Sequence, residues 1–260
     1  MAARDDWRFG QYPSLADRVV FVTGGGSGIG ESVVEHFCRQ RSRVAFVDIA
    51  EPPSRGLCTR LRETGLPEPL YIECDLRDIG ALQQAVATVG RELGPITVLV
   101  NNAARDDRHA IQEVTPEYWD ERMAVNLRHQ FFAAQAVFPQ MKSQGGGSIV
   151  NMGSISWMFS QGGMPAYTTA KAAVHGLTRS LARDYGPVGI RVNTVVPGWV
   201  MTRRQIELWL DEAGERELEA RQCLKTKLMP EDVACMVLFL AAEDSAMCTA
   251  QNFIVDGGWV

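Results

Sequence analysis

Thr23-Gly24-Gly25-Gly26-Ser27-Gly28-Ile29-Gly30 is the stretch of this sequence that decides the fold. It follows a short apolar run at 18–23 and opens a segment with helical periodicity at 28–40. Backbone N–H groups and the positive end of a helix dipole can hold a pyrophosphate at such a turn. The glycines are spaced G-x-x-x-G-x-G, and a glycine-rich turn by itself can be no more than a tight bend. Its position between a strand and a helix favours the binding of a dinucleotide.

Outward from this turn, short β-branched runs alternate with longer stretches of helical periodicity, which is typical of repeated βαβ units. Runs such as 19–22 and 98–100 are apolar throughout, as expected when both faces of a sheet are covered. We predict an α/β fold: one Rossmann-type domain over 1–260, with a doubly wound, seven-stranded parallel sheet and helices on both faces. The predicted strands are 18–23, 43–48, 70–74, 96–101, 148–152, 191–196 and 253–255, and the predicted helices are 28–40, 51–63, 79–93, 116–143, 165–185 and 230–242.

The composition favours small-molecule partners. Of the 260 residues, 26 are basic and 31 acidic, and no block of like charge marks a nucleic-acid or membrane surface. The N-terminal extension 1–14 lacks the apolar stretch of a signal peptide, and no later run reaches the roughly 20 apolar residues of a membrane span. The six cysteines include no C-x-x-C pair and the four histidines lie far apart. Free thiols in the cytoplasm and no metal site are therefore expected, with disulfides or a metal as the alternative.

Acidic and amide side chains follow the predicted strands. Asp48 ends the second strand, where a carboxylate can accept hydrogen bonds from ribose hydroxyls and repel a 2′-phosphate. Neither Ser27 nor Ile49 offers the basic group of an NADP site, so we predict NAD, although Asp48 could be a helix cap. Asp75 and 101–104 lie at the same sheet edge, where each could instead serve only to stabilise a turn. The residues predicted to bind the cofactor include Gly24, Ser27, Gly28, Ile29, Gly30, Asp48, Ile49, Asp75, Leu76, Asn101 and Ala103.

A catalytic set is suggested by Tyr167 and Lys171, which are four residues apart in one predicted helix and share a face. An ammonium near a phenol lowers a pKa of about 10 and makes tyrosine usable as a base near neutrality. Such a pair is also common on solvated helices. Ser154 adds a hydroxyl just past the fifth predicted strand, and Asn126 adds an amide within a helix.

Several motifs therefore occur in order along the chain: 23–30, 101–104, Asn126, Ser154, Tyr167 with Lys171, and Pro197-Gly198. In this combination the sequence resembles the short-chain dehydrogenase/reductase family from about residue 15 to residue 260, with Ala104 where the family usually has glycine. The resemblance implies that Tyr167 is the base, that Lys171 lowers its pKa and binds the nicotinamide ribose, and that Ser154 orients the substrate oxygen. Asn126 would hold a water that relays the proton.

The same resemblance implies further contacts and an assembly. Pro197, Gly198, Val200 and Thr202 would frame the nicotinamide, with Thr202 on its carboxamide. The resemblance also implies a homotetramer, with the predicted helices 116–143 and 165–185 at one interface and the C-terminal strand at another. A non-catalytic NAD-binding scaffold is disfavoured because an inert binder has no need of the complete catalytic set.

A narrower resemblance is carried by 102–109, 118–122, 153–157, 196–205, 222–225 and 256–259. These segments are similar to those of bacterial NAD-dependent aldose 1-dehydrogenases of the D-xylose and L-arabinose type, which oxidise the anomeric hydroxyl of a sugar to an aldonolactone. An NAD(P)-dependent carbonyl reductase or secondary-alcohol dehydrogenase of the same family is the alternative. Segment 161–164 differs from the pattern expected of the D-xylose enzymes, so the particular sugar stays open.

A sugar site needs many hydrogen-bonding groups and an aromatic face for the C–H side of the ring. The irregular, charged segment 199–227 is expected to be a lid over the substrate. The charges of 105–109 could instead pair among themselves in a solvated loop, and the tryptophans could be lid packing. The residues predicted to bind substrate are Asp106, Arg108, His109, Ser154, Ser156, Trp157, Gln161, Tyr167 and Trp199.

Overall fold

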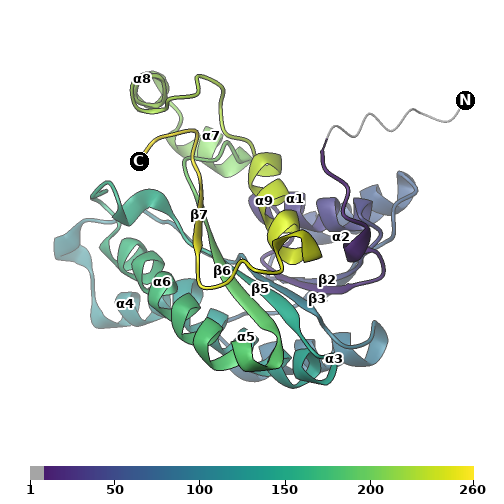
Figure 1. Ribbon diagram of the computed structural model, residues 1–260. Coiled ribbons are helices and arrows are strands. Elements are labelled where there is room, and N and C mark those ends of the chain that lie inside the picture. Colours follow the sequence, from purple (N-terminus) through teal and green to yellow (C-terminus); the bar gives the residue numbers. More distant parts are fainter. Residues whose placement is uncertain (1–8) are drawn as a thin grey trace, which may run out of the picture.

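Seven parallel strands form one sheet within the described part of the chain, residues 9–260 of the computed structural model (Figure 1). The strand order is β3-β2-β1-β4-β5-β6-β7, so the chain reverses its direction of winding between β1 and β4. The predicted doubly wound α/β sheet is confirmed. The strands are β1 Val19–Thr23, β2 Arg43–Asp48, β3 Leu70–Glu73, β4 Val98–Asn101, β5 Gly147–Met152, β6 Ile190–Pro197 and β7 Asn252–Val255.

Helices cover both faces of the sheet. The side chains of β1 illustrate this, because they alternate between two buried cores. Val20 and Val22 belong to one apolar core, and Val19 and Phe21 belong to the other, because successive side chains of a strand point to opposite faces. All four side chains are buried, which explains the absence of polar residues in this run. The first core is covered by α1 Gly28–Arg39, α2 Glu51–Glu63 and α9 Pro230–Ala241, and the second by α3 Ile79–Glu92, α5 His129–Ser143 and α6 Pro165–Tyr185 (Figure 1).

The predicted single helix at 116–143 is wrong in one respect. The segment consists of α4 Pro116–Met123, a π-helical turn over Ala124–Arg128, and α5. A π turn adds one residue to a helical turn and is frequent at functional sites. The apolar period of the sequence does not reveal such an insertion. Here it contains Asn126, whose side chain is fully buried.

Segment 199–227 contains two short helices, α7 Arg203–Trp209 and α8 Glu212–Arg221. Each begins at a residue whose side-chain oxygen accepts a backbone N–H bond, Thr202 for α7 and Asp211 for α8. The C-terminal tail holds the end of this segment, since the Leu224 N–H donates to the Gly257 carbonyl at 2.9 Å. Figure 1 shows α7 and α8 beside the C-terminus, beyond the end of β7.

The predicted N-terminal extension 1–14 lies partly outside the described residues, which begin at Phe9. Its last part is tied to the end of α1, because Gln40 accepts a bond from the Tyr12 N–H and donates one to the Gly10 carbonyl. Across residues 9–260, no helix has the combination of length and apolar character that crossing a bilayer requires.

Candidate active site

A cavity of about 1210 Å³ lies along the carboxyl ends of the strands. In a doubly wound sheet, the change in winding direction opens a crevice at this edge. The cavity extends from the glycine-rich turn to α7 and α8. The predicted site residues that line it are Gly24, Ser27, Gly28, Ile29, Asp48, Ile49, Asp75, Leu76, Ala103, Asp106, Arg108, Ser154, Ser156, Gln161, Tyr167, Lys171, Pro197, Gly198, Trp199, Val200 and Thr202.

The glycine-rich turn is shaped by close backbone contacts. Gly24 has φ +68°, and a Cβ atom there would lie 2.8 Å from the Ala103 Cα atom. A Cβ atom on Gly30 would lie 1.9 Å from the Gly24 carbonyl oxygen, so side chains are excluded at both positions. Gly30 therefore packs beneath the turn and is absent from the cavity lining.

The two asparagines after β4 have different positions. Asn101 was predicted to bind the cofactor, but its fully buried side chain donates to Asn151 Oδ1 at 2.9 Å and ties β4 to β5. Asn102 lines the cavity instead, and its Nδ2 donates to the Gly24 carbonyl at 2.8 Å. The sequence placed both residues at the right sheet edge. Their side chains take different positions because successive side chains at the end of a strand point in opposite directions.

The carboxylate of Asp48 lines the cavity at the end of β2. One of its oxygens accepts a hydrogen bond from the Gly26 N–H at 2.9 Å, and the other accepts one from the Ala50 N–H at 3.0 Å. Asp48 therefore holds the glycine-rich turn in place. The exclusion of side chains at this turn, the start of α1 and the Asp48 carboxylate together fit the pyrophosphate and adenosine ribose of a dinucleotide.

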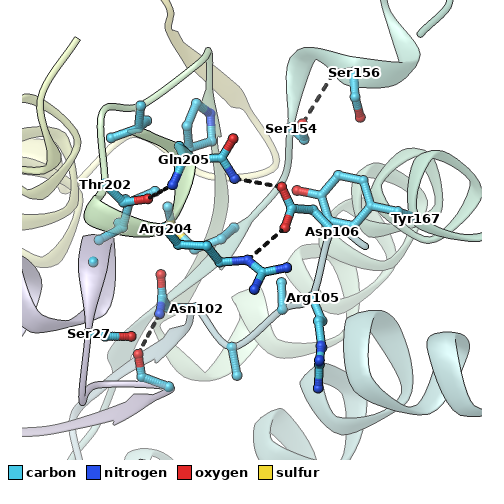
Figure 2. A pocket seen from close by; sticks show the side chains of 18 of the residues that line it. Ser27, Asn102, Arg105, Asp106, Ser154, Ser156, Tyr167, Thr202, Arg204 and Gln205 are labelled. Carbon is cyan, nitrogen blue, oxygen red and sulfur yellow. Dashed lines mark hydrogen bonds and ion pairs between the residues drawn. The ribbon is translucent and has the colours of Figure 1, made fainter. Parts of the chain in front are cut away.

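The predicted catalytic side chains Ser154, Tyr167 and Lys171 meet in the middle of the cavity. The first follows β5, and the other two lie on one face of α6. Lys171 is only 1% exposed, and its Nζ donates to the Met152 carbonyl at 2.8 Å and lies 5.6 Å from the Tyr167 ring centroid. Figure 2 shows the Tyr167 hydroxyl directed toward the carboxylate of Asp106.

The acid–base state of this group differs from the expectation that Lys171 lowers the phenol pKa. Burial raises the pKa of Tyr167 above its ordinary value, the negative charge of Asp106 raises it further, and Ser154 and Arg108 only partly oppose this. Burial also lowers the pKa of Lys171 to about 8. Removal from water is the largest cause of both shifts, because it disfavours the charged form of each group.

Asn126 lies outside the cavity lining. Its Oδ1 accepts a bond from the Arg105 N–H at 2.7 Å, and its Nδ2 donates to the Arg105 carbonyl at 3.1 Å. Both halves of the amide are thus bonded to one residue of the loop after β4. In this arrangement Asn126 positions that loop, which carries Asp106 and Arg108 into the cavity.

The far end of the cavity is assembled by contacts between the loop after β4 and α7. Asp106 accepts a bond from Gln205 Nε2 at 2.7 Å and is 3.4 Å from Arg204 Nε (Figure 2). Arg204 also bonds to Asp107 at 2.8 Å, and Trp199 Nε1 donates to Gln205 at 3.0 Å. The sequence analysis missed Arg204 and Gln205, as well as Trp209 and Trp259 in the lining. Arg204 and Gln205 lie in the segment 196–205 that carries the narrower resemblance, Trp209 lies in the segment expected to be a lid, and Trp259 lies in the C-terminal segment 256–259.

Two of the predicted substrate residues lie outside the cavity lining. His109 Nδ1 is 2.9 Å from the Tyr118 hydroxyl, and the two rings pack edge to face. Trp157 donates from Nε1 to His175 at 3.2 Å, and its ring packs against the imidazole of that residue. Part of the loop after β4 is also paired internally, since Arg105 and Asp107 form an ion pair at 2.8 Å.

Comparisons with known proteins agree with this geometry. A family model described as enoyl-(acyl carrier protein) reductase matches residues 24–260. A probable galactose dehydrogenase, GalD, from Rhizobium meliloti is 52% identical over 95% of this chain and 97% of its own length. The D-xylose 1-dehydrogenase of Caulobacter vibrioides is 49% identical over 95% of this chain and 98% of its own.

A solved structure, a short-chain type dehydrogenase/reductase from Mycobacterium ulcerans, superposes with a TM-score of 0.90. It is 27% identical, and the match covers 95% of this chain and 90% of that one. The chain belongs to the short-chain dehydrogenase/reductase family. This short-chain dehydrogenase is an oxidoreductase whose cofactor is a nicotinamide dinucleotide, NAD or NADP. No three His, Cys, Asp or Glu side chains gather into a metal-binding group within residues 9–260.

Proposed function

We propose that this short-chain dehydrogenase uses NAD to oxidise the anomeric C1 hydroxyl of an aldose, a pentose or a closely related sugar, to the aldonolactone. The observation that carries the proposal is the near-full-length similarity to two relatives named for aldose oxidation, at 52% and 49% identity. The cavity supports it, because residues with hydroxyl, carboxylate, guanidinium and indole groups line it together with the catalytic side chains. This combination suits a polyhydroxylated ring.

In the proposed reaction, Tyr167 accepts the proton of the anomeric hydroxyl and Ser154 donates a hydrogen bond to the same oxygen. As the O–H bond breaks, C1–O becomes a carbonyl and the C1 hydrogen leaves with its electron pair. The bound nicotinamide supplies the acceptor for that hydride. Lys171 lies on the same helix face as Tyr167, and its ammonium favours the phenolate when the lysine is protonated.

NAD rather than NADP is proposed because Asp48 presents a carboxylate where the adenosine ribose would lie. Its oxygens already hold the backbone of Gly26 and Ala50, so its position is fixed before a cofactor binds. A fixed carboxylate can accept from ribose hydroxyls and repels a 2′-phosphate.

We further propose that the protein is a cytoplasmic homotetramer whose segment 199–227 acts as a substrate lid. Phe131 on α5 is 40% exposed and Ile254 on the edge strand β7 is 44% exposed, and burial against further copies of the chain would remove both from water. No disulfide joins any of the six cysteines within residues 9–260, which fits a reducing compartment. Light scattering after size-exclusion chromatography gives the mass directly, and a monomer would contradict the assembly.

The activity is tested by incubating the protein with NAD or NADP and a panel of substrates, read as absorbance of the reduced cofactor. The panel contains D-xylose, L-arabinose, L-fucose, D-galactose and a plain secondary alcohol, with product analysis for lactone or aldonate. We expect at least one aldose to exceed the alcohol greatly in kcat/KM. If the alcohol is the better substrate, or only carbonyl reduction occurs, the proposal fails and the family assignment stands.

A further inference from the structure

Four arginines surround the loop after β4, and one of them lacks a carboxylate partner. Arg105, Arg122 and Arg204 all pair with Asp107, at 2.8, 2.7 and 2.8 Å. Arg108 forms no ion pair with any residue of 9–260, although its side chain lines the cavity. Its guanidinium is therefore the positive group of this cluster that is left for a ligand.

The Arg108 guanidinium contacts a thioether and an aromatic ring. Its Nη1 donates to the thioether sulfur of Met164 at 3.2 Å, and its guanidinium lies 5.0 Å from the centroid of the Trp209 ring. A thioether is a weak acceptor, and a guanidinium has five N–H donors in a planar fork. Burial lowers the pKa of Arg108, which agrees with the loss of water around it. Most of its donors therefore have no strong acceptor within the described chain.

Other donors of the same cavity also lack acceptors. Ser156 is only 4% exposed, and its Oγ has no hydrogen-bond partner among the described residues. The indole N–H of Trp209 is buried and equally unpartnered within 9–260. Both residues line the cavity together with Arg108. A buried donor without an acceptor is costly. Both atoms are covered by the protein, however, so the donors that a ligand in the cavity can reach are those of Arg108.

One carboxylate lies near Arg108, although it forms no ion pair with it. Asp106 is close enough to raise the pKa of Arg108, and its carboxylate faces the Tyr167 hydroxyl in Figure 2. An anionic ligand would meet this carboxylate, whereas a neutral ligand rich in oxygen atoms would not be repelled. The position of Asp106 therefore favours a neutral acceptor over an anion as the ligand of Arg108.

We infer that Arg108 is a specificity-determining residue that binds neutral hydroxyls of the sugar away from C1. This inference rests on the proposed aldose oxidation and adds the part of the substrate that is recognised. The planar fork of Arg108 can bind two adjacent hydroxyl oxygens at once. A sugar that lacks one of them leaves the guanidinium unpaired and is a poor substrate.

The test compares kcat/KM for the best aldose and its 2-, 3- and 4-deoxy forms in the unmodified enzyme and in Arg108→Met. The unmodified enzyme should lose about 10- to 100-fold with at least one deoxy form, as expected for a bond to a charged donor. Arg108→Met should use the parent sugar about 10- to 100-fold less well, and should no longer distinguish it from that deoxy form. The affinity for NAD, measured by calorimetry, should not change.

Arg105→Met is the matched control, because it removes an arginine of the same loop that is already paired with Asp107. It should keep the discrimination among deoxy sugars.

Either of two results would overturn this inference and leave the proposed aldose oxidation in place. One is an Arg108→Met enzyme that slows with all sugars equally and still discriminates between them. The other is a preference of the unmodified enzyme for a uronate over the matching neutral sugar, because the ligand of Arg108 would then be an anion. If no aldose is oxidised at all, the proposed function fails and this inference fails with it.

Discussion

The two ends of the cavity are formed by different parts of the structure. The nucleotide end is made by a turn, 23–30, and by residues at or just past the ends of strands, such as Asp48 and Ala103. The substrate end is made by side chains that meet across the chain, as when Gln205 bonds to Asp106 from 99 residues away. Local sequence therefore specifies the nucleotide end, whereas tertiary contacts assemble the substrate end.

The difference between the two ends predicts how substitutions in each of them should act. At the nucleotide end, shape depends on the backbone, because side chains are excluded at Gly24 and Gly30. At the substrate end, Asp106 and Asp107 hold α7 through Arg204 and Gln205, so one substitution moves several groups. Variants of the two ends should separate cofactor binding from sugar use.

The largest effect is expected from Tyr167→Phe, where the two ends meet. The substitution keeps the ring and removes only the proton acceptor, so turnover should fall by about 10² to 10⁴-fold. NAD affinity, measured by calorimetry, should stay within about twofold because the nucleotide end is untouched. An enzyme with much of its turnover left would refute the assignment of Tyr167 as the base.

Asp48→Ala probes the nucleotide end alone. Loss of a charged acceptor and of repulsion toward a 2′-phosphate should lower the ratio of kcat/KM for NAD over NADP by about 10- to 100-fold. The ranking of sugars should not change. Equal use of both cofactors by the unmodified protein would contradict the proposed role of Asp48, and a changed sugar ranking would break the separation of the two ends.

The pH dependence of oxidation tests the catalytic group, where the two ends of the cavity meet. Because the base is the phenolate and burial raises the pKa of Tyr167, the deprotonated fraction is small at neutral pH and grows as pH rises. Oxidation should therefore speed up by about tenfold per pH unit below the apparent pKa in profiles of log kcat/KM against pH. Lys171, whose pKa is lowered to about 8, loses its favourable charge above that pH, so the rise should level off there. A rate that falls from pH 7 to pH 9 would contradict this.

Arg204→Met should have the smallest effect, because this ion pair is half exposed and such pairs contribute little. We expect kcat/KM for the sugar to fall about two- to fivefold, mostly through KM, with unchanged NAD affinity. Arg216→Met is a matched control, since Arg216 is an exposed arginine of α8 outside the cavity lining. If Arg204→Met weakens NAD binding as strongly as sugar use, the two ends are not independent.

Several features could be predicted from the sequence because they depend on near neighbours along the chain. The order of strands and helices, the turn 23–30 and the sharing of a helix face by Tyr167 and Lys171 all follow from periods of two and about four residues. The carboxyl ends of parallel strands lie at one sheet edge, so Asp48 and Ser154 could be assigned to one site before their positions were known.

Other features were decided only by the tertiary structure. Asn101 and Asn102 are adjacent in sequence, yet one ties two strands together and the other lines the cavity. The π turn at Ala124–Arg128 leaves the apolar pattern unchanged, and the pKa of Tyr167 is set by burial that no local pattern records. Asp107 pairs with three other arginines, whereas Arg108 has no carboxylate partner within residues 9–260. Desolvation and pairing depend on what lies nearby in space, and the folded chain brings together residues that the sequence keeps far apart.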